Sequence, residues 1–192
     1  MNTISVMIVG VGGQGTLLAS KVLGQALVSM DYDVKVSEVH GMSQRGGSVV
    51  TYVRYGDEVH SPIVDLGQAD YMLAFEPLEA ARYLPYLKKD GVIITNTRET
   101  MPMPVITGAA AYPENIVEKL KARANVVALD AMALALEAGN AKAVNMVLMG
   151  VLASRMDLPE DVWQAALAKQ VPAKFLELNR RAFALGQAQK GV

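Results

Sequence analysis

The stretch Ile4-Ser-Val-Met-Ile-Val-Gly-Val-Gly-Gly-Gln-Gly15 decides the fold of this chain. Its first six residues are largely apolar, which is typical of a strand covered by helices on both faces. A glycine-rich turn follows, and the next segment, residues 14–30, carries Leu18, Val22 and Ala26 on one helical face. This order of strand, glycine turn and helix predicts the first unit of a doubly wound α/β sheet.

The rest of the sequence continues this alternation and then becomes helical. Further strands are expected at residues 34–39, 48–55, 71–75, 92–95 and 126–129, and helices at 78–87 and 113–122. Glu76, just before the first of these helices, is expected to cap it. Asp90-Gly91 is expected to form a turn, and residues 105–107 a strand or loop. Helices are then expected at residues 131–137, 141–156, 159–169 and 173–189. We therefore expect a mostly parallel, Rossmann-like sheet with a helical C-terminal region, in a single domain of residues 1–192.

The second and third strands depart from a plain Rossmann order. Too few residues separate the segments 34–39 and 48–55 for a crossover helix, which a parallel pair would need. This pair is therefore expected to be antiparallel or to lie at an edge of the sheet.

Two C-terminal segments have contrasting apolar patterns. Residues 143–152 are apolar on nearly every side of a helix, so this segment should be buried all round. The last helix instead has one apolar stripe, formed by Phe175, Leu178, Ala182 and Leu185. That stripe predicts an amphipathic helix with one buried face.

The composition excludes several classes of partner. The chain has 192 residues, 52% of them apolar, and a formal net charge of -1. Without a basic patch, it offers no electrostatic footprint to nucleic acid or to an anionic membrane. No stretch reaches the roughly 18 consecutive apolar residues of a membrane-spanning helix, and no secretory signal is recognisable. We expect a cytoplasmic protein that binds neither nucleic acid nor a membrane.

The residues that commonly bind metals are scarce. Cysteine is absent, so the chain supplies no thiolates to zinc or to an iron–sulfur cluster. The two histidines, His40 and His60, do not form a metal-binding motif. We therefore expect no metal site on this chain, and any iron–sulfur centre would belong to a partner.

The first glycine turn allows two interpretations. Gly10, Gly12 and Gly15 match the G-x-G-x-x-G spacing, in which a helix N-terminus faces a phosphate group. The same turn also occurs where only tight packing is needed. A dinucleotide site would use an acid at the end of the second strand, and Glu38, 23 residues after Gly15, is the one candidate. No substrate domain or placed acid/base pair accompanies it.

A second glycine-rich segment, Glu38-Val-His-Gly-Met-Ser-Gln-Arg-Gly-Gly47, is dense in polar side chains. His40 is either a general base or a hydrogen-bonding strut for the turn. Ser43 does not fit the G-x-S-x-G spacing of a nucleophile, and bonding to the backbone is its expected role. Arg45 has the fork geometry to bind an anion or a partner, the alternative being a surface salt bridge.

Three stretches together resemble a known family. They are Gly10-Val-Gly-Gly-Gln-Gly-Thr-Leu-Leu-Ala19, Ser37-Glu-Val-His-Gly-Met-Ser-Gln-Arg-Gly-Gly-Ser48 and Asn145-Met-Val-Leu-Met-Gly150. In this order they resemble the gamma-type domain of 2-oxoacid:ferredoxin oxidoreductases, over essentially the whole chain. Within that family the chain is most similar to the beta-subunit type of the indolepyruvate ferredoxin oxidoreductases.

The resemblance implies an accessory subunit of a larger enzyme. Such an enzyme decarboxylates a 2-oxoacid on thiamine diphosphate, passes electrons through 4Fe-4S clusters to ferredoxin, and releases an acyl-coenzyme A. Thiamine diphosphate, magnesium and the clusters would lie on a large alpha subunit, and the chain alone would be inactive. Aryl pyruvates are the implied substrates, although related chains serve pyruvate, 2-oxoglutarate or branched-chain oxoacids.

The resemblance and the glycine pattern together predict residues for binding or interface contact, none of them catalytic. They are Gly10, Gly12, Gly13, Gln14, Gly15, Glu38, His40, Ser43, Gln44, Arg45, Gly46 and Gly47. Whether they contact coenzyme A or only the alpha subunit stays open at this point. A structural module would lose assembly but not coenzyme A affinity on Arg45→Ala. The other alternative is a small oxidoreductase that binds a nucleotide or flavin by itself.

Overall fold

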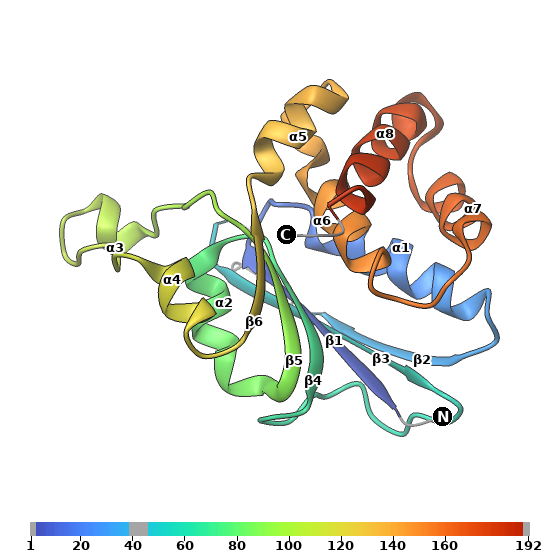
Figure 1. Ribbon diagram of the computed structural model, residues 1–192, viewed down its shortest axis with the longest axis horizontal. Helices are drawn as coiled ribbons and strands as arrows, with labels where there is room; N and C mark the ends of the chain where they lie inside the picture. The colour runs from blue at the N-terminus through green and yellow to red at the C-terminus, as the bar shows by residue number, and fades with distance from the viewer. Residues whose placement is uncertain (1–2, 39–45, 190–192) are drawn as a thin grey trace.

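A six-stranded sheet organises the computed structural model, which describes residues 3–38 and 46–189 (Figure 1). The strands are β1 (Ile4–Val11), β2 (Asp33–Glu38), β3 (Ser48–Gly56), β4 (Ala69–Ala74), β5 (Leu87–Asn96) and β6 (Asn125–Leu129). Their order across the sheet is β2-β3-β1-β4-β5-β6. β3 is antiparallel to both of its neighbours, whereas the pairs from β1 to β6 are parallel. The predicted mostly parallel α/β sheet is confirmed, with β2 at an edge and antiparallel to β3.

Helices cover both faces of this sheet, as the doubly wound prediction required (Figure 1). On one face lie α1 (Thr16–Val28), α5 (Ala131–Ala138), α6 (Val144–Ala153), α7 (Glu160–Gln170) and α8 (Leu176–Gln187). The other face packs against α2 (Pro77–Tyr83) and α4 (Ile116–Lys121), and the short α3 (Met103–Ile106) lies beyond them. Short 3-10 turns occur at Leu84–Tyr86, Ala141–Ala143 and Ala173–Phe175. Within the described ranges, no helix is long and apolar enough to cross a membrane.

β1 is buried on both faces, which explains its nearly unbroken apolar sequence. Val6 and Ile8 pack into the core beneath α1, α6 and α8. Met7 and Val9 point to the opposite face and pack with residues of α2 and α4. Because successive side chains of a strand point to opposite faces, a strand between two helical layers must be apolar at every position.

Two local predictions were wrong. Asp90-Gly91 lies inside β5 instead of forming a turn, at a register shift where β5 pairs with β4. A side chain at Gly91 would place its Cβ 2.8 Å from the carbonyl oxygen of Ala69, so glycine allows the two strands to approach here. Residues 105–107 form no strand, since the first two lie in α3, whose first turn accepts Pro104.

α6 is the buried helix that the sequence predicted. All of its residues from Asn145 to Ala153 are buried. Gly150 of α6 lies against the backbone of α8, where an added Cβ would be 2.0 Å from the carbonyl oxygen of Phe183. The contact is reciprocal, because a Cβ on Gly186 would be 2.0 Å from the carbonyl oxygen of Val147. The two helices therefore pack backbone to backbone through a pair of glycines.

The glycine contact between α6 and α8 changes which residues of α8 are buried, compared with the predicted apolar stripe. The buried residues of the helix are Asn179, Ala182, Phe183 and Gly186. Phe175 precedes α8 and is 44% exposed, under the ammonium group of Lys174. The apolar spacing of three and four residues predicted the helix correctly, but the prediction that Phe175 belongs to its buried face was wrong. The close glycine contact determines which side of α8 faces α6.

We predict that Gly150→Ala and Gly186→Ala each lower the free energy of unfolding by about 2 kcal/mol or more. The added methyl group would meet backbone atoms that cannot rotate away. Gly24→Ala, in α1, is the matched control, since its Cβ would lie 3.9 Å from the nearest atom, in Val36. That control should leave stability unchanged or raise it by up to about 1 kcal/mol. Urea unfolding of the three variants measures the difference, and equal stabilities would contradict the packing described.

Candidate functional site

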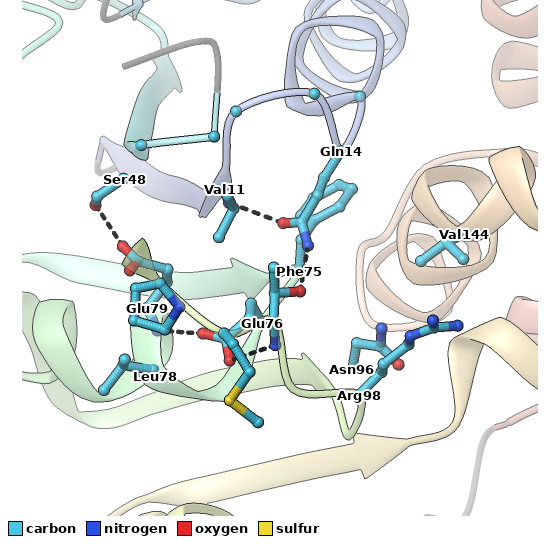
Figure 2. Close-up of a pocket in the computed structure, with 18 of the residues that line it drawn as sticks. Val11, Gln14, Ser48, Phe75, Glu76, Leu78, Glu79, Asn96, Arg98 and Val144 are labelled. Atoms are coloured by element: carbon cyan, nitrogen blue, oxygen red, sulfur yellow. Dashed lines mark hydrogen bonds between the residues drawn. The ribbon is translucent and has the colours of Figure 1, made fainter. Parts of the chain in front are cut away.

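A pocket of about 1120 Å³ lies at the carboxyl ends of β1, β4 and β5 (Figure 2). Five segments contribute most of its lining: the glycine turn after β1, residues 46–48 at the start of β3, the N-terminus of α2 after β4, the segment after β5, and the residues that lead into α6. In open α/β sheets, ligands bind at this end of the strands. The volume is also of the order that cofactor-sized ligands occupy.

The glycines of the first turn have structural reasons to be glycine. Gly13 and Gly15 have φ angles of +98° and +89°, which side chains with a Cβ rarely adopt. A Cβ on Gly15 would also lie 2.7 Å from Nδ2 of Asn145, which donates a 3.4 Å hydrogen bond to the Gly15 carbonyl. Gly12 N–H donates to the carbonyl of Gly47 at 2.8 Å, so the two glycine-rich segments are joined.

Gln14 folds back over this turn and holds it (Figure 2). Its Oε1 accepts a 2.8 Å hydrogen bond from Val11 N–H, and its Nε2 donates to Oγ1 of Thr100 at 3.4 Å. A Cβ on Gly10 would lie 2.8 Å from the Gln14 Oε1 and 3.0 Å from Cβ of Phe75. Gly10 is therefore needed for the fold of the turn, and Gln14 links the turn to the segment after β5.

The structure brings together part of the predicted site. Residues Gly12, Gly13, Gln14, Gly15, Gly46 and Gly47 all line the pocket. His40, Ser43, Gln44 and Arg45 lie outside the described residues. The two glycine segments thus share one pocket.

Glu38 does not lie where a dinucleotide site would need it. Its Oε1 accepts a 2.8 Å hydrogen bond from Oγ of Ser20, and the residue lines a separate, smaller recess beside α1. The physical reason is the strand order, because antiparallel β3 separates β2 from β1. The ribose-binding acid of a Rossmann fold ends a strand that adjoins the first one. The structure therefore opposes the ribose-binding role considered for Glu38.

Two buried carboxylates, Glu76 and Glu79, line the pocket at the start of α2. The sequence indicated a role for Glu76 alone, as a helix cap. Glu76 is 1% exposed, and its Oε2 accepts a 3.0 Å hydrogen bond from Glu79 N–H, which confirms the predicted helix cap. Glu79 accepts a hydrogen bond from the hydroxyl of Ser48 (Figure 2). It accepts another, at 3.0 Å, from Nε of Arg82. Each carboxylate is therefore supplied with donors, as burial requires.

The electrostatics of Glu76 reflect this burial. Removal from water raises the pKa of the Glu76 carboxyl, and hydrogen bonds from Tyr112 and from backbone N–H groups oppose the rise. Burial also raises the pKa of the Tyr112 hydroxyl, with a further contribution from the hydrogen bond to Glu76. Tyr112 consequently stays protonated and acts as the donor of that hydrogen bond.

Two cations at the pocket were missed by the sequence reasoning. Arg98 follows β5 and Lys142 precedes α6, and both residues are exposed. Neither side chain forms an ion pair or hydrogen bond with another residue of the described ranges, whereas Arg82 is paired with Glu79. Figure 2 shows Arg98 beside Asn96. The position of Arg98 just after a central strand was the available signal.

The remaining wall of the pocket is apolar. It includes Met101, Met103 and Ile106, which follow Arg98 in the chain. The pocket therefore combines unpaired positive charge with an apolar surface. This combination suits a ligand that has both anionic groups and an apolar chain.

The donor set for metals is poor. Among the described residues, no group of three or more His, Cys, Asp or Glu side chains is placed to hold a metal ion. The sequence also has no cysteine, so an iron–sulfur cluster would lack its thiolate ligands. These residues do not fit such a cluster.

Comparisons with known proteins identify the family of the chain. The family model described as pyruvate ferredoxin/flavodoxin oxidoreductase matches residues 5–189. A curated relative, indolepyruvate oxidoreductase subunit IorB of Thermococcus kodakarensis, is 45% identical over 97% of this chain and 95% of its own length.

Two solved structures share the fold. Pyruvate oxidoreductase subunit PORC of Thermotoga maritima has a TM-score of 0.76 at 19% identity, over 98% of this chain and 97% of its own. The 2-oxoglutarate:ferredoxin oxidoreductase of Magnetococcus marinus has a TM-score of 0.75 at 17% identity, over 98% of this chain and 31% of its own. The chain belongs to the pyruvate ferredoxin/flavodoxin oxidoreductase family, as an oxidoreductase subunit.

Proposed function

We propose that this chain is the accessory subunit of an indolepyruvate, or aryl pyruvate, ferredoxin oxidoreductase. The complete enzyme would convert an aryl pyruvate, coenzyme A and two oxidised ferredoxins into an acyl-coenzyme A, carbon dioxide, a proton and two reduced ferredoxins. The identity of 45% to an indolepyruvate oxidoreductase subunit supports this choice of substrate. In this proposal residues 1–192 form one gamma-type domain, and the cytoplasmic location expected from the sequence stays a prediction.

The cofactors would belong to a large alpha subunit. A chain without cysteine does not hold 4Fe-4S clusters, and its described residues offer no group of metal ligands. We assign thiamine diphosphate, magnesium and the clusters to the alpha subunit, through which ferredoxin would also be reduced. The chemistry of decarboxylation and electron transfer then lies with those groups.

The contribution of this chain would be to bind coenzyme A in the pocket. The observation that carries this assignment is that two cations without an ion-pair partner among the described residues, Arg98 and Lys142, lie beside an apolar wall in a pocket of about 1120 Å³. Coenzyme A has phosphate groups at one end and a long arm, in which methyl and methylene groups alternate with two amides, that ends in the thiol. Guanidinium and ammonium groups recognise phosphates. The related enzyme of Magnetococcus marinus was solved with coenzyme A bound.

The structure bears differently on the two alternative functions, an independent oxidoreductase and a purely structural module. A small oxidoreductase that binds a dinucleotide by itself loses its ribose-binding acid, because Glu38 pairs with Ser20 away from the pocket. A structural role for the glycine turns alone is supported by their internal contacts, since Gly12 and Gln14 bond within the chain. That role explains the glycines but gives no reason for free cations beside an apolar wall.

We predict that Arg98→Ala and Lys142→Ala each raise the KM for coenzyme A about tenfold in the assembled enzyme, because each removes a charge-assisted hydrogen bond to a phosphate. The KM for the 2-oxoacid and the kcat at saturating coenzyme A should stay within about twofold. Steady-state assays of ferredoxin reduction measure these parameters.

The matched controls are Arg123→Ala and Lys121→Ala, which remove the same side chains from exposed positions outside the pocket. They should leave all three kinetic parameters unchanged. If the Arg98 and Lys142 variants weaken assembly with the alpha subunit but leave the KM for coenzyme A unchanged, the structural alternative is correct and the proposed site is wrong.

A further inference from the structure

The segment between β5 and α4, residues 97–112, is held in an unusual way. We call it the pocket arm. It contains α3 and lies to one side of the sheet, beyond α2 and α4 (Figure 1). Met101, Met103 and Ile106 of the arm line the pocket, yet they are 42%, 65% and 65% exposed. The apolar wall is therefore formed by a segment with little cover of its own.

The middle of the pocket arm bonds only to itself. Among the described residues, the hydrogen bonds of residues 101–111 stay within the arm, as from Val105 and Ile106 N–H to the Pro102 carbonyl and from Ala110 N–H to the Pro104 carbonyl. These bonds give the arm its own shape. They do not fix its position relative to the sheet, which depends on its two ends.

Both ends of the arm converge on one carboxylate oxygen. Oε1 of Glu76 accepts a 3.3 Å hydrogen bond from Thr100 N–H near the start of the arm, and another from the hydroxyl of Tyr112 at its end. Oε2 of the same carboxylate caps α2 through Glu79 N–H at 3.0 Å. Glu76 therefore joins the two ends of the arm to the helix that forms the floor of the pocket.

Thr100 also receives a contact from the first glycine turn. Its Oγ1 accepts the 3.4 Å hydrogen bond from Nε2 of Gln14, in the first glycine turn. One residue of the arm thus contacts both the glycine turn and Glu76. A bond between Thr97 N–H and the Leu129 carbonyl, at 2.9 Å, adds a further attachment at the root of the arm.

We propose that Glu76 is a positioning residue that clasps the two ends of the pocket arm and so sets the apolar wall against which coenzyme A binds. The inference rests on the proposed function of the pocket. Glu76 does not touch the ligand in this account, because its oxygens are occupied by Thr100, Tyr112 and Glu79. Its effect on coenzyme A is transmitted through the position of the arm.

The most specific variant is Tyr112→Phe, because it removes one bond of the clasp and leaves the cap of α2 in place. In the assembled enzyme, hydrogen exchange of the arm, followed at the Thr100 N–H that bonds to Glu76, should become about fivefold faster, the loss expected for one hydrogen bond. The KM for coenzyme A should rise about fivefold, with kcat at saturating coenzyme A within about twofold.

A second variant and a matched control complete the test. Glu76→Gln has one acceptor oxygen, for which the two ends of the arm and the helix cap compete, so the arm should be held less firmly than in the native chain. Tyr71→Phe is the control, because it removes a hydroxyl that donates at 3.1 Å to the Arg155 carbonyl, away from the pocket. This control should change neither the exchange of the arm nor the KM for coenzyme A.

Two results would overturn the proposal. Unchanged exchange of the arm in both Tyr112→Phe and Glu76→Gln would show that Glu76 does not hold it. Faster exchange without a change in the KM for coenzyme A would show that its position does not matter for binding, provided that Arg98→Ala does raise that KM. If Arg98→Ala also leaves it unchanged, the proposed coenzyme A site is what fails.

Discussion

The burial of β1 between two helical layers is the constraint on which the rest of the structure depends. Val6 and Ile8 require α1, α6 and α8 on one face, and Met7 and Val9 require α2 and α4 on the other. A strand enclosed in this way can meet a ligand only at its ends, and in open α/β sheets ligands bind at the carboxyl end. The glycine turn, the start of α2 and the pocket arm meet at that end, so the pocket is a consequence of how the sheet is covered.

The insertion of β3 beside β1 determines what this Rossmann-like fold can bind. Because β3 is antiparallel and separates β2 from β1, the carboxylate at the end of β2 is directed to α1 and not to the pocket. The glycine turn keeps its tight geometry, but the acid that a dinucleotide site needs is displaced. The cations available to a ligand come instead from the residues after β5 and before α6. This exchange of an acid for cations favours a ligand with several phosphate groups.

Sequence periodicity predicted what depends on local patterns. The strand at residues 4–9 and the buried helix at 143–152 were found because their apolar patterns match their surroundings. The antiparallel or edge placement of the second and third strands was found from the short connection between them. The pocket arm was not predicted, because its two prolines and exposed methionines form no helical or strand periodicity. Its position also depends on a carboxylate that is distant in the sequence. Glu76 was recognised as a cap, whereas its bonds to Thr100 and Tyr112 join residues far apart in the chain.

The measurement that tests the central claim most directly is purification of the tagged chain from its native cells without oxygen. Iron analysis and an assay of indolepyruvate-dependent reduction of ferredoxin, with and without coenzyme A, would follow. The account predicts a large, iron-containing partner and activity that requires both indolepyruvate and coenzyme A. A chain that purifies alone with a bound nucleotide or flavin would contradict the account and favour an independent oxidoreductase.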